Sequence, residues 1–140
     1  MTFSINKVCL AGNVGGDPDV RRLQGNGKRI ANLMLATNEA WTHLGKSLER
    51  VDWHRVVFLS EGLVAYVEEY VRNGSPIYVE GKLQVRKYKD AAAAGQVSIE
   101  VVVSHPHGCL QMVRPGVRGS MEGQVLTYDR VFARADVPAA

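Results

Sequence analysis

Long apolar runs and cysteine are both scarce in this 140-residue sequence, and each scarcity excludes a class of protein. No stretch approaches the roughly 18 consecutive apolar residues of a membrane-spanning helix. The first residues carry no basic leader followed by an apolar segment, which argues against secretion. The two cysteines, Cys9 and Cys109, are too few for a disulfide scaffold. We therefore expect a cytoplasmic protein that is not associated with a membrane.

The motifs of common enzymes are also missing. The sequence has no P-loop and no GxGxxG motif, and GNVGG at residues 12–16 is not followed by a helix that could bind a phosphate. Asp52 and His54 are the only close acid and histidine, and no nucleophile lies near them in the sequence. We predict a protein that is not an enzyme and that uses no cofactor.

A metal site is the weaker of two interpretations of His105, His107 and Cys109. On an extended strand their spacing would put three ligands on one side. However, Pro106 and Gly108 indicate a turn, and no fourth ligand is evident. We favour a solvated loop at this position and predict no metal.

Positive charge is present in only a small excess, because 17 Lys and Arg residues stand against 14 Asp and Glu residues. This excess does not by itself indicate a polyanionic partner, so the positions of the cations must decide. Hydrophobic residues make up 46% of the chain, enough for one domain with its own core. We predict one domain over residues 1–113 and a C-terminal tail over residues 114–140.

Strand patterning dominates the sequence. Alternating apolar residues predict strands at residues 5–13, 30–41, 51–59, 77–89 and 97–103, with a further short strand near residues 110–113. Residues 60–74 have helical spacing, with Ser60 as a candidate N-cap and Asn73-Gly74 as the end. GNVGGDP is predicted to be a turn that ends the first strand. Residues 42–50 are predicted to be a long hairpin connection that could bind a ligand.

This order of elements predicts the fold class. Three strands, one helix and two further strands, without a second helix, do not fit a sandwich or a βαβ layout. They predict an all-β protein: a five-stranded OB-fold Greek-key barrel with one α-helix between the third and fourth strands.

The third predicted strand mixes an aromatic ring with a cation. Alternation puts Trp53 and Arg55 on one face, whereas His54 and Phe58 fall on the other. A purely structural role remains open for each residue, with Trp53 as a core or interface anchor and Arg55 paired with Asp52 or Glu80.

The fourth predicted strand repeats this combination of residues. Its odd positions are apolar or small, whereas its even positions include Tyr78, Lys82, Arg86 and Tyr88. Bases stack on aromatic faces and cations hold the phosphate backbone, so rings interleaved with Lys and Arg favour a single-stranded nucleic acid.

Six segments, in this order, resemble the bacterial single-stranded DNA-binding protein family over about residues 5–113. They are NKVCLAGNVGGDPDVR, IANLMLATNEAW, DWHRVVF, EYVRNGS, IYVEGKLQVRKY and IEVVV with the following LQM. The resemblance implies an OB fold, assembled as a homotetramer or at least a dimer, that binds single-stranded DNA without sequence preference and without catalysis. It implies a nucleoid-associated protein that protects DNA during replication, recombination, repair or conjugative transfer.

The resemblance also implies residue roles. The positions that stack bases are Trp41, Trp53 and Tyr88, with Tyr88 in place of the more usual tryptophan. We expect the DNA backbone to be held by Lys7, Arg55, Lys82, Arg86 and Lys87. The positions at subunit contacts are His54, Tyr78 and Gln111.

The chain departs from the family pattern in three places. The family has leucine and then phenylalanine where this chain has Phe58-Leu59, and the loop after the fourth strand is DAAAAG, which is not polar. The family's tail ends in an acidic run that closes with proline and phenylalanine, whereas residues 114–140 hold four arginines and three acids and end in RADVPAA. Recruitment of replication and repair proteins is therefore not predicted from this tail.

The structure of the tail and the function of the chain both have alternatives. The tail is either a mostly disordered end or, at residues 124–132, a strand or docking segment. The first alternative function is an OB-fold adaptor of the replication-restart type, which would act mainly through protein contacts. The second is an RNA-binding module, because stacking platforms do not by themselves exclude a 2′-hydroxyl.

Overall fold

The computed structural model describes residues 2–87 and 97–113. Tyr88, the DAAAAG loop and the tail at residues 114–140 lie outside the described residues. Among the described residues, no helix is long and apolar enough to cross a membrane.

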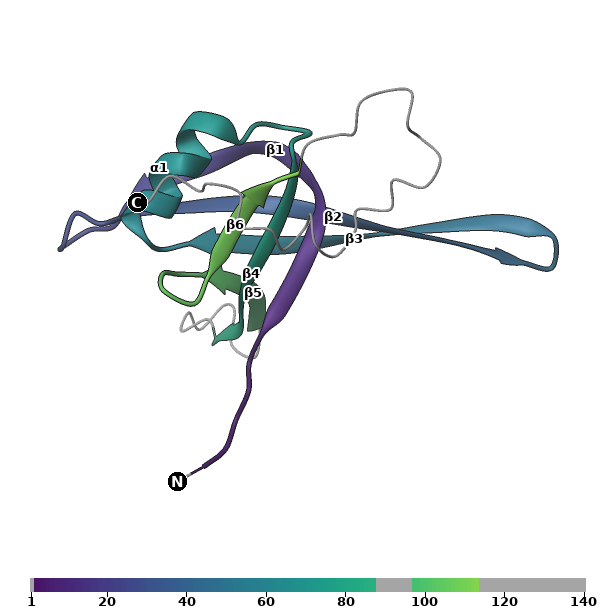
Figure 1. Cartoon of the computed structure of the whole chain (residues 1–140), viewed down its shortest axis with the longest axis horizontal. Coiled ribbons are helices and arrows are strands. Elements are labelled where there is room, and N and C mark those ends of the chain that lie inside the picture. Colours follow the sequence, from purple (N-terminus) through teal and green to yellow (C-terminus); the bar gives the residue numbers. More distant parts are fainter. Residues whose placement is uncertain (1, 88–96, 114–140) are drawn as a thin grey trace.

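Within the described ranges, six strands and one helix form the fold (Figure 1). In chain order they are β1 Val8–Arg22, β2 Arg29–His43, β3 Lys46–Phe58, α1 Glu61–Tyr70, β4 Pro76–Lys87, β5 Val97–Val103 and β6 Cys109–Met112.

The strands close into a barrel. The sheet order is β1-β2-β3-β5-β4-β6, and an additional pairing of β1 with β4 closes five of the strands on themselves. All pairs are antiparallel except β3 with β5, where Val56–Phe58 run alongside Val101–Val103. The helix lies between β3 and β4 in the sequence, as predicted, so the OB-fold prediction is confirmed.

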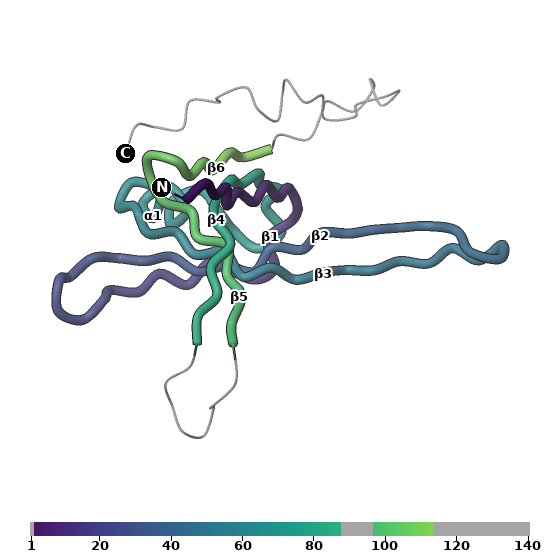
Figure 2. The backbone as a smooth tube through the Cα atoms, turned by 90° about the horizontal axis from the view of Figure 1, so that it is seen from below, coloured from purple at the N-terminus to yellow at the C-terminus, as the bar shows by residue number. Residues whose placement is uncertain are grey.

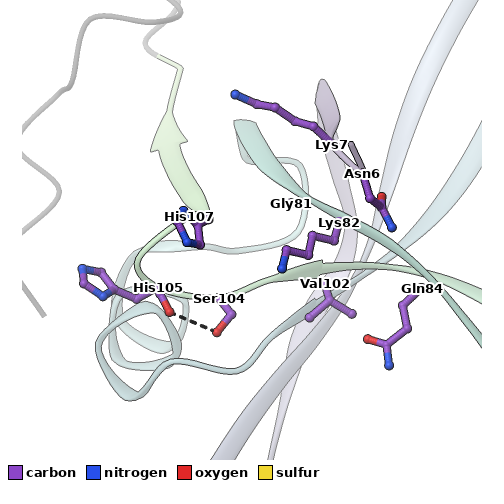
Figure 3. Close-up of a pocket in the computed structure, with 10 residues that line it drawn as sticks. Asn6, Lys7, Gly81, Lys82, Gln84, Val102, Ser104, His105 and His107 are labelled. Carbon is purple, nitrogen blue, oxygen red and sulfur yellow. Dashed lines mark hydrogen bonds between the residues drawn. The ribbon is translucent and has the colours of Figure 1, made fainter. Parts of the chain in front are cut away.

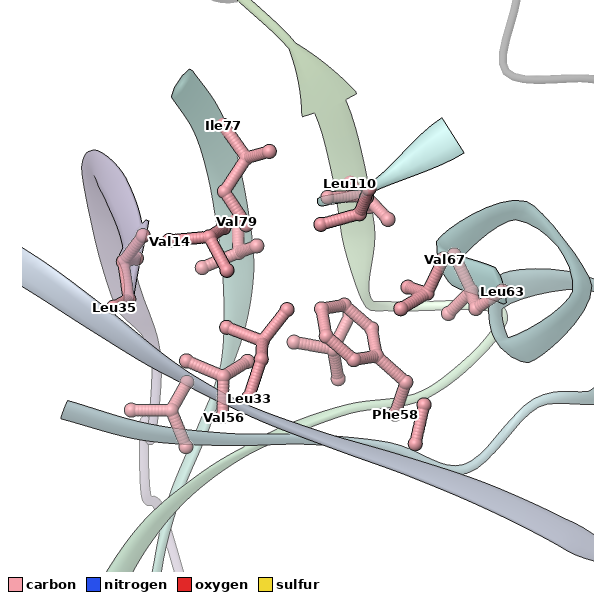
Figure 4. Close-up of a cluster of buried hydrophobic side chains, with 14 of the residues drawn as sticks. Val14, Leu33, Leu35, Val56, Phe58, Leu63, Val67, Ile77, Val79 and Leu110 are labelled. Carbon is pink, nitrogen blue, oxygen red and sulfur yellow. The ribbon is translucent and has the colours of Figure 1, made fainter. Parts of the chain in front are cut away.

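The core fills the barrel and extends under the helix (Figure 4). Inward side chains of every strand contribute, and Leu63, Val64 and Val67 of α1 cover one end. Phe58 lies at the centre with no exposed surface. The alternation that puts Phe58 on the face opposite Trp53 is therefore confirmed, and the exposed residue of the Phe58-Leu59 pair is Leu59.

The first strand is longer than predicted. The prediction that GNVGGDP is a turn is wrong, because β1 runs through it to Arg22. The first half of β1 pairs with β4 and the second half with β2, and the register shifts between Gly15 and Asp19. Such an irregularity bends a strand, which lets one strand contribute to both sides of the barrel.

The hairpin predicted at residues 42–50 is present, but the length predicted for its connection is wrong. It consists of strand on both sides of a two-residue turn, in which Leu44 and Gly45 have φ values of 49° and 75°. Positive φ at both central residues is the geometry of the commonest tight hairpin turn. The pairing of β2 with β3 continues from Ala31↔Phe58 to His43↔Lys46, so the hairpin extends as a long two-stranded arm away from the barrel (Figure 2).

Helix α1 begins where predicted but ends earlier. It ends at Tyr70 rather than at Asn73-Gly74. Ser60 occupies the N-cap position, but its side chain makes no cap hydrogen bond. Its Oγ instead accepts a hydrogen bond from the backbone N–H of His105 at 2.6 Å, which ties the start of the helix to the turn between β5 and β6.

Candidate nucleic-acid interface

Trp53 projects from the outer face of β3, where its side chain is 56% exposed. It pairs across the ladder with Ala36, whose small side chain leaves the ring uncovered. The ring lies over Gly15 of β1: a Cβ atom added to Gly15 would come within 2.7 Å of Cη2 of Trp53. The ring is thus held from below by a strand backbone and open to solvent above, as a stacking platform requires.

Arg55 shares this outer face, two residues further along β3. It lies opposite Met34, which itself lies opposite Gly15, and Arg55 and Gly15 line the same concavity. The alternative in which Arg55 pairs with Asp52 or Glu80 is not supported. Asp52 pairs with Arg50 at 3.0 Å and Glu80 with Lys7 at 3.3 Å, and no ion pair of Arg55 is found within residues 2–87 and 97–113.

A shallow groove of about 410 Å³ connects this face to β4 and β5. Gly15, Arg55, Arg86 and Glu100 are among the residues that line it. Arg86 is exposed, and its Nη2 lies 3.6 Å from Oε2 of Glu100. Glu100 is 95% buried, and that oxygen accepts no hydrogen bond within the described part of the chain. We call this concavity the central groove.

Gly15 and Glu100 of the central groove are not identified from the sequence. Gly15 falls in the segment predicted to be a turn, and no pattern indicates that a ring rests on it. Glu100 lies on the polar face of a strand that otherwise reads as apolar. A buried carboxylate beside an exposed arginine is visible only once β4 and β5 are paired in register, with Gln84 opposite Glu100.

Trp41 lies away from the central groove, on the hairpin arm. Its side chain is 44% exposed and lies opposite Leu48. The partner of Trp53, Ala36, is five residues earlier on β2, a distance of about 17 Å along a strand. The structure therefore brings Trp53, Arg55 and Arg86 to one region and places Trp41 at a separate one.

The three predicted lysines are exposed at different places. Lys82 and Lys87 are on β4, opposite Val102 and Val97, and Lys82 shares the outer face with Arg86. Lys7 precedes β1, and its ammonium group pairs with Glu80.

The predicted subunit-contact residues form two groups. The ring of His54 hydrogen-bonds to Oγ1 of Thr37 at 2.8 Å and is partly buried. Tyr78 and Gln111 lie opposite each other on β4 and β6, and both are almost fully buried within this single chain. The hydroxyl of Tyr78 donates to Oε1 of Glu80 at 2.6 Å. Burial raises the pKa of Tyr78, and the hydrogen bond to Glu80 raises it further.

The metal interpretation of His105, His107 and Cys109 finds no support within the described ranges, where no group of three or more His, Cys, Asp or Glu side chains could hold an ion. Residues 104–108 form a turn, as Pro106 and Gly108 predicted, in which the N–H of Gly108 donates to the carbonyl of Ser104 at 2.6 Å.

Comparison with known proteins agrees with this geometry. The sequence model that describes the single-strand binding protein family matches residues 5–115 of this chain. A single-stranded DNA-binding protein of Rhizobium meliloti is 45% identical over 115 residues, which are 81% of this chain and 66% of that protein. One from Rickettsia prowazekii is 50% identical over 107 residues, 75% of this chain and 70% of that protein. The chain thus spans about two thirds of the length of these relatives.

A solved structure shares the arrangement of strands. The structure described as the Plasmodium falciparum SSB complex with ssDNA superimposes with a TM-score of 0.73 at 33% identity, covering 81% of this chain and 99% of that one. Sequence and fold therefore agree, and the chain belongs to the single-strand binding protein family.

Proposed function

We propose that this protein binds single-stranded DNA without reading its sequence, and so protects DNA exposed during replication, recombination, repair or conjugative transfer. The observation that carries the proposal is the half-exposed Trp53 ring, supported by Gly15 and bordered by Arg55 at the head of the central groove. A ring with one free face can stack on any base, because every base has a π face.

The binding path begins at this ring. Trp53 stacks a base while Arg55 and Arg86 contact the phosphates on either side of it. Trp41 provides a second stacking surface on the hairpin arm, and Tyr88, which lies outside the described residues, is proposed as a third. Lys7, Lys82 and Lys87 extend the set of backbone cations. Contacts to ring faces and phosphates carry no sequence information, so this path binds any single strand.

The relatives support this proposal by what they bind. Proteins named single-stranded DNA-binding protein match three quarters or more of the chain at 45% and 50% identity. The similar solved structure is itself a complex with single-stranded DNA. We propose that the present chain likewise acts by binding alone, without catalysis, in the cytoplasm and on the nucleoid.

We further propose that the protein assembles as a homotetramer, or at least as a dimer, with contacts near His54, Tyr78 and Gln111. Because Tyr78 and Gln111 are buried within one chain, a partner would contact the exposed residues around them, such as Cys9 on the neighbouring strand. Sedimentation velocity of the full chain measures the assembly directly, and a monomer at micromolar concentration would contradict it.

The decisive experiment is a titration of intrinsic tryptophan fluorescence with dT and rU oligomers at several salt concentrations. We expect strong quenching by dT and a log–log salt slope of about −0.7 per neutralised phosphate. Trp53→Ala should weaken binding while the domain stays folded. Absence of quenching by dT would refute the proposal, stronger quenching by rU would indicate an RNA-binding module, and binding of neither would favour a protein adaptor.

A further inference from the structure

A second concavity lies beside the turn between β5 and β6, and its histidines have no role in the path described so far (Figure 3). Its volume is about 480 Å³. Cations and histidines gather around it, from three parts of the chain: Lys7 before β1, Lys82 on β4, and His105 and His107 on the turn. We call it the turn pocket.

The lining of the turn pocket is suited to an anion. None of the residues that line it is acidic, and Asn6 and Gln84 add neutral polar groups. The carboxylate of Glu80 lies outside the pocket, paired with Lys7 at 3.3 Å. Lys82 forms no ion pair with any residue in the described ranges, and Figure 3 shows it extending toward the turn that carries His105 and His107. The charged groups that face the histidines are therefore Lys7 and Lys82, and behind Lys7 lies the carboxylate of Glu80, which pairs with it.

The turn that carries the histidines is held in place. The backbone N–H of His105 donates to Ser60 at the start of α1, at 2.6 Å, and Gly108 closes the turn onto Ser104. A Cβ atom at Gly108 would lie 2.5 Å from the backbone nitrogen of Ser104, so only glycine fits there. Exposed imidazoles on an anchored turn are presented at fixed positions, which favours binding of a specific group.

The turn pocket continues the central groove. Lys82, Gln84 and Arg86 follow one another on the outer face of β4, and successive members are about 7 Å apart along a strand. Arg86 lines the central groove, whereas Lys82 and Gln84 line the turn pocket. A backbone that leaves Trp53 along Arg55 and Arg86 therefore reaches Lys82 and the histidines without leaving this face.

We propose that the turn pocket binds a phosphodiester of the same single-stranded DNA, with Lys82, His105 and His107 as phosphate-binding residues. This inference rests on the proposed function. Histidine as a class takes up a proton between pH 8 and pH 5, whereas a phosphodiester stays negative throughout. The pocket therefore makes binding of single-stranded DNA tighter at pH 6 than at pH 8.

The test compares the full chain with a His105→Gln/His107→Gln double variant and, as matched control, with His43→Gln at the end of the hairpin arm. Anisotropy of a labelled dT oligomer is measured at pH 6 and pH 8 over a range of salt. We expect the double variant to lose about five-fold in affinity at pH 6 and little at pH 8, while His43→Gln keeps the wild-type pH dependence. Lys82→Gln should lower the magnitude of the salt slope by about 0.7 at both pH values.

The inference is overturned, while the proposed function stands, if the double variant binds dT like wild type at pH 6 or if the pH dependence is lost in His43→Gln instead. It is also overturned if the double variant has a changed sedimentation coefficient and unchanged affinity, because the pocket would then be a subunit contact. NMR of the histidine rings separates DNA from free anion. Resonances that move with inorganic phosphate but not with dT would assign the pocket to a free anion and also overturn the inference. If the wild-type chain binds no dT at all, the proposed function fails as well.

Discussion

Replacing Gly15 by alanine tests whether the support under Trp53 matters for binding. The added Cβ atom would lie 2.7 Å from Cη2 of Trp53 and closer still to Cζ3. Carbon atoms in ordinary contact are about 3.6 Å apart, so the ring would have to move by at least about 1 Å. These atoms are at the far end of a half-exposed side chain, so the ring can swing outward while the strand backbone stays in place.

The expected result is a loss of affinity without a loss of fold. A stacked base contributes roughly 1 to 3 kcal/mol, so a ring displaced from its stacking position lowers affinity by about 5-fold to about 150-fold. Gly15 does not need a positive φ. The free energy of unfolding should therefore change by no more than about 1 kcal/mol. Anisotropy of a labelled dT oligomer measures affinity, and urea denaturation measures stability.

The control for this prediction is a double-mutant cycle with Trp53→Ala. If Gly15 acts only by supporting the ring, Gly15→Ala should have almost no further effect once the ring is gone. An equal loss of affinity in both backgrounds would refute the reasoning, and so would a Gly15→Ala variant that binds as tightly as wild type.

Two further substitutions test the assignment of faces. Phe58→Ala should destabilise the domain by about 3 to 5 kcal/mol in urea denaturation, because it empties the centre of the core, while the folded fraction binds dT normally. A stable variant with weak binding would show that Phe58 faces the DNA. Glu100→Gln removes the carboxylate 3.6 Å from Arg86 and should tighten binding of dT by about two-fold to five-fold, with a steeper salt dependence. Weaker binding by a folded Glu100→Gln variant would contradict the position of Arg86 on the path.

Side-chain alternation was sufficient to predict the two faces of β3 around Trp53 and Phe58, but not those of β4, where Tyr78 is buried and Leu83 and Val85 are exposed. A strand with one buried face has a strict period of two, so Trp53 and Arg55 had to point away from Phe58. The helix and the order of strands were also predictable, because helical spacing occurs at only one place in the pattern. These features depend on neighbours in the sequence, which is why the sequence alone reveals them.

The errors arose where contacts distant in the sequence decide the structure. Glycine, aspartate and proline in GNVGGDP are typical of a turn, but pairing with β4 and then β2 keeps this segment in a bent strand. The residues at 42–50 are mostly polar because both faces of the arm meet solvent, so they lack the alternation of a half-buried strand. The support of Trp53 by Gly15 depends on the same pairings, and no local signal could have indicated it.

The charges around the central groove explain why a protein with a net charge of only +3 can still be specific for a polyanion. The groove is lined by three arginines and three acids, so the acids offset the cations there: Arg21, Arg55, Arg86, Asp17, Asp19 and Glu100. Coulomb attraction to phosphates is correspondingly reduced at the groove, and stacking on Trp53 must supply a larger share of the free energy of binding. Stacking on a protein ring requires a base with a free face, whereas both faces of a base inside a duplex are covered by the neighbouring base pairs. A groove with little net charge beside an open ring therefore favours single strands over duplex DNA, which a uniformly basic surface would bind as well.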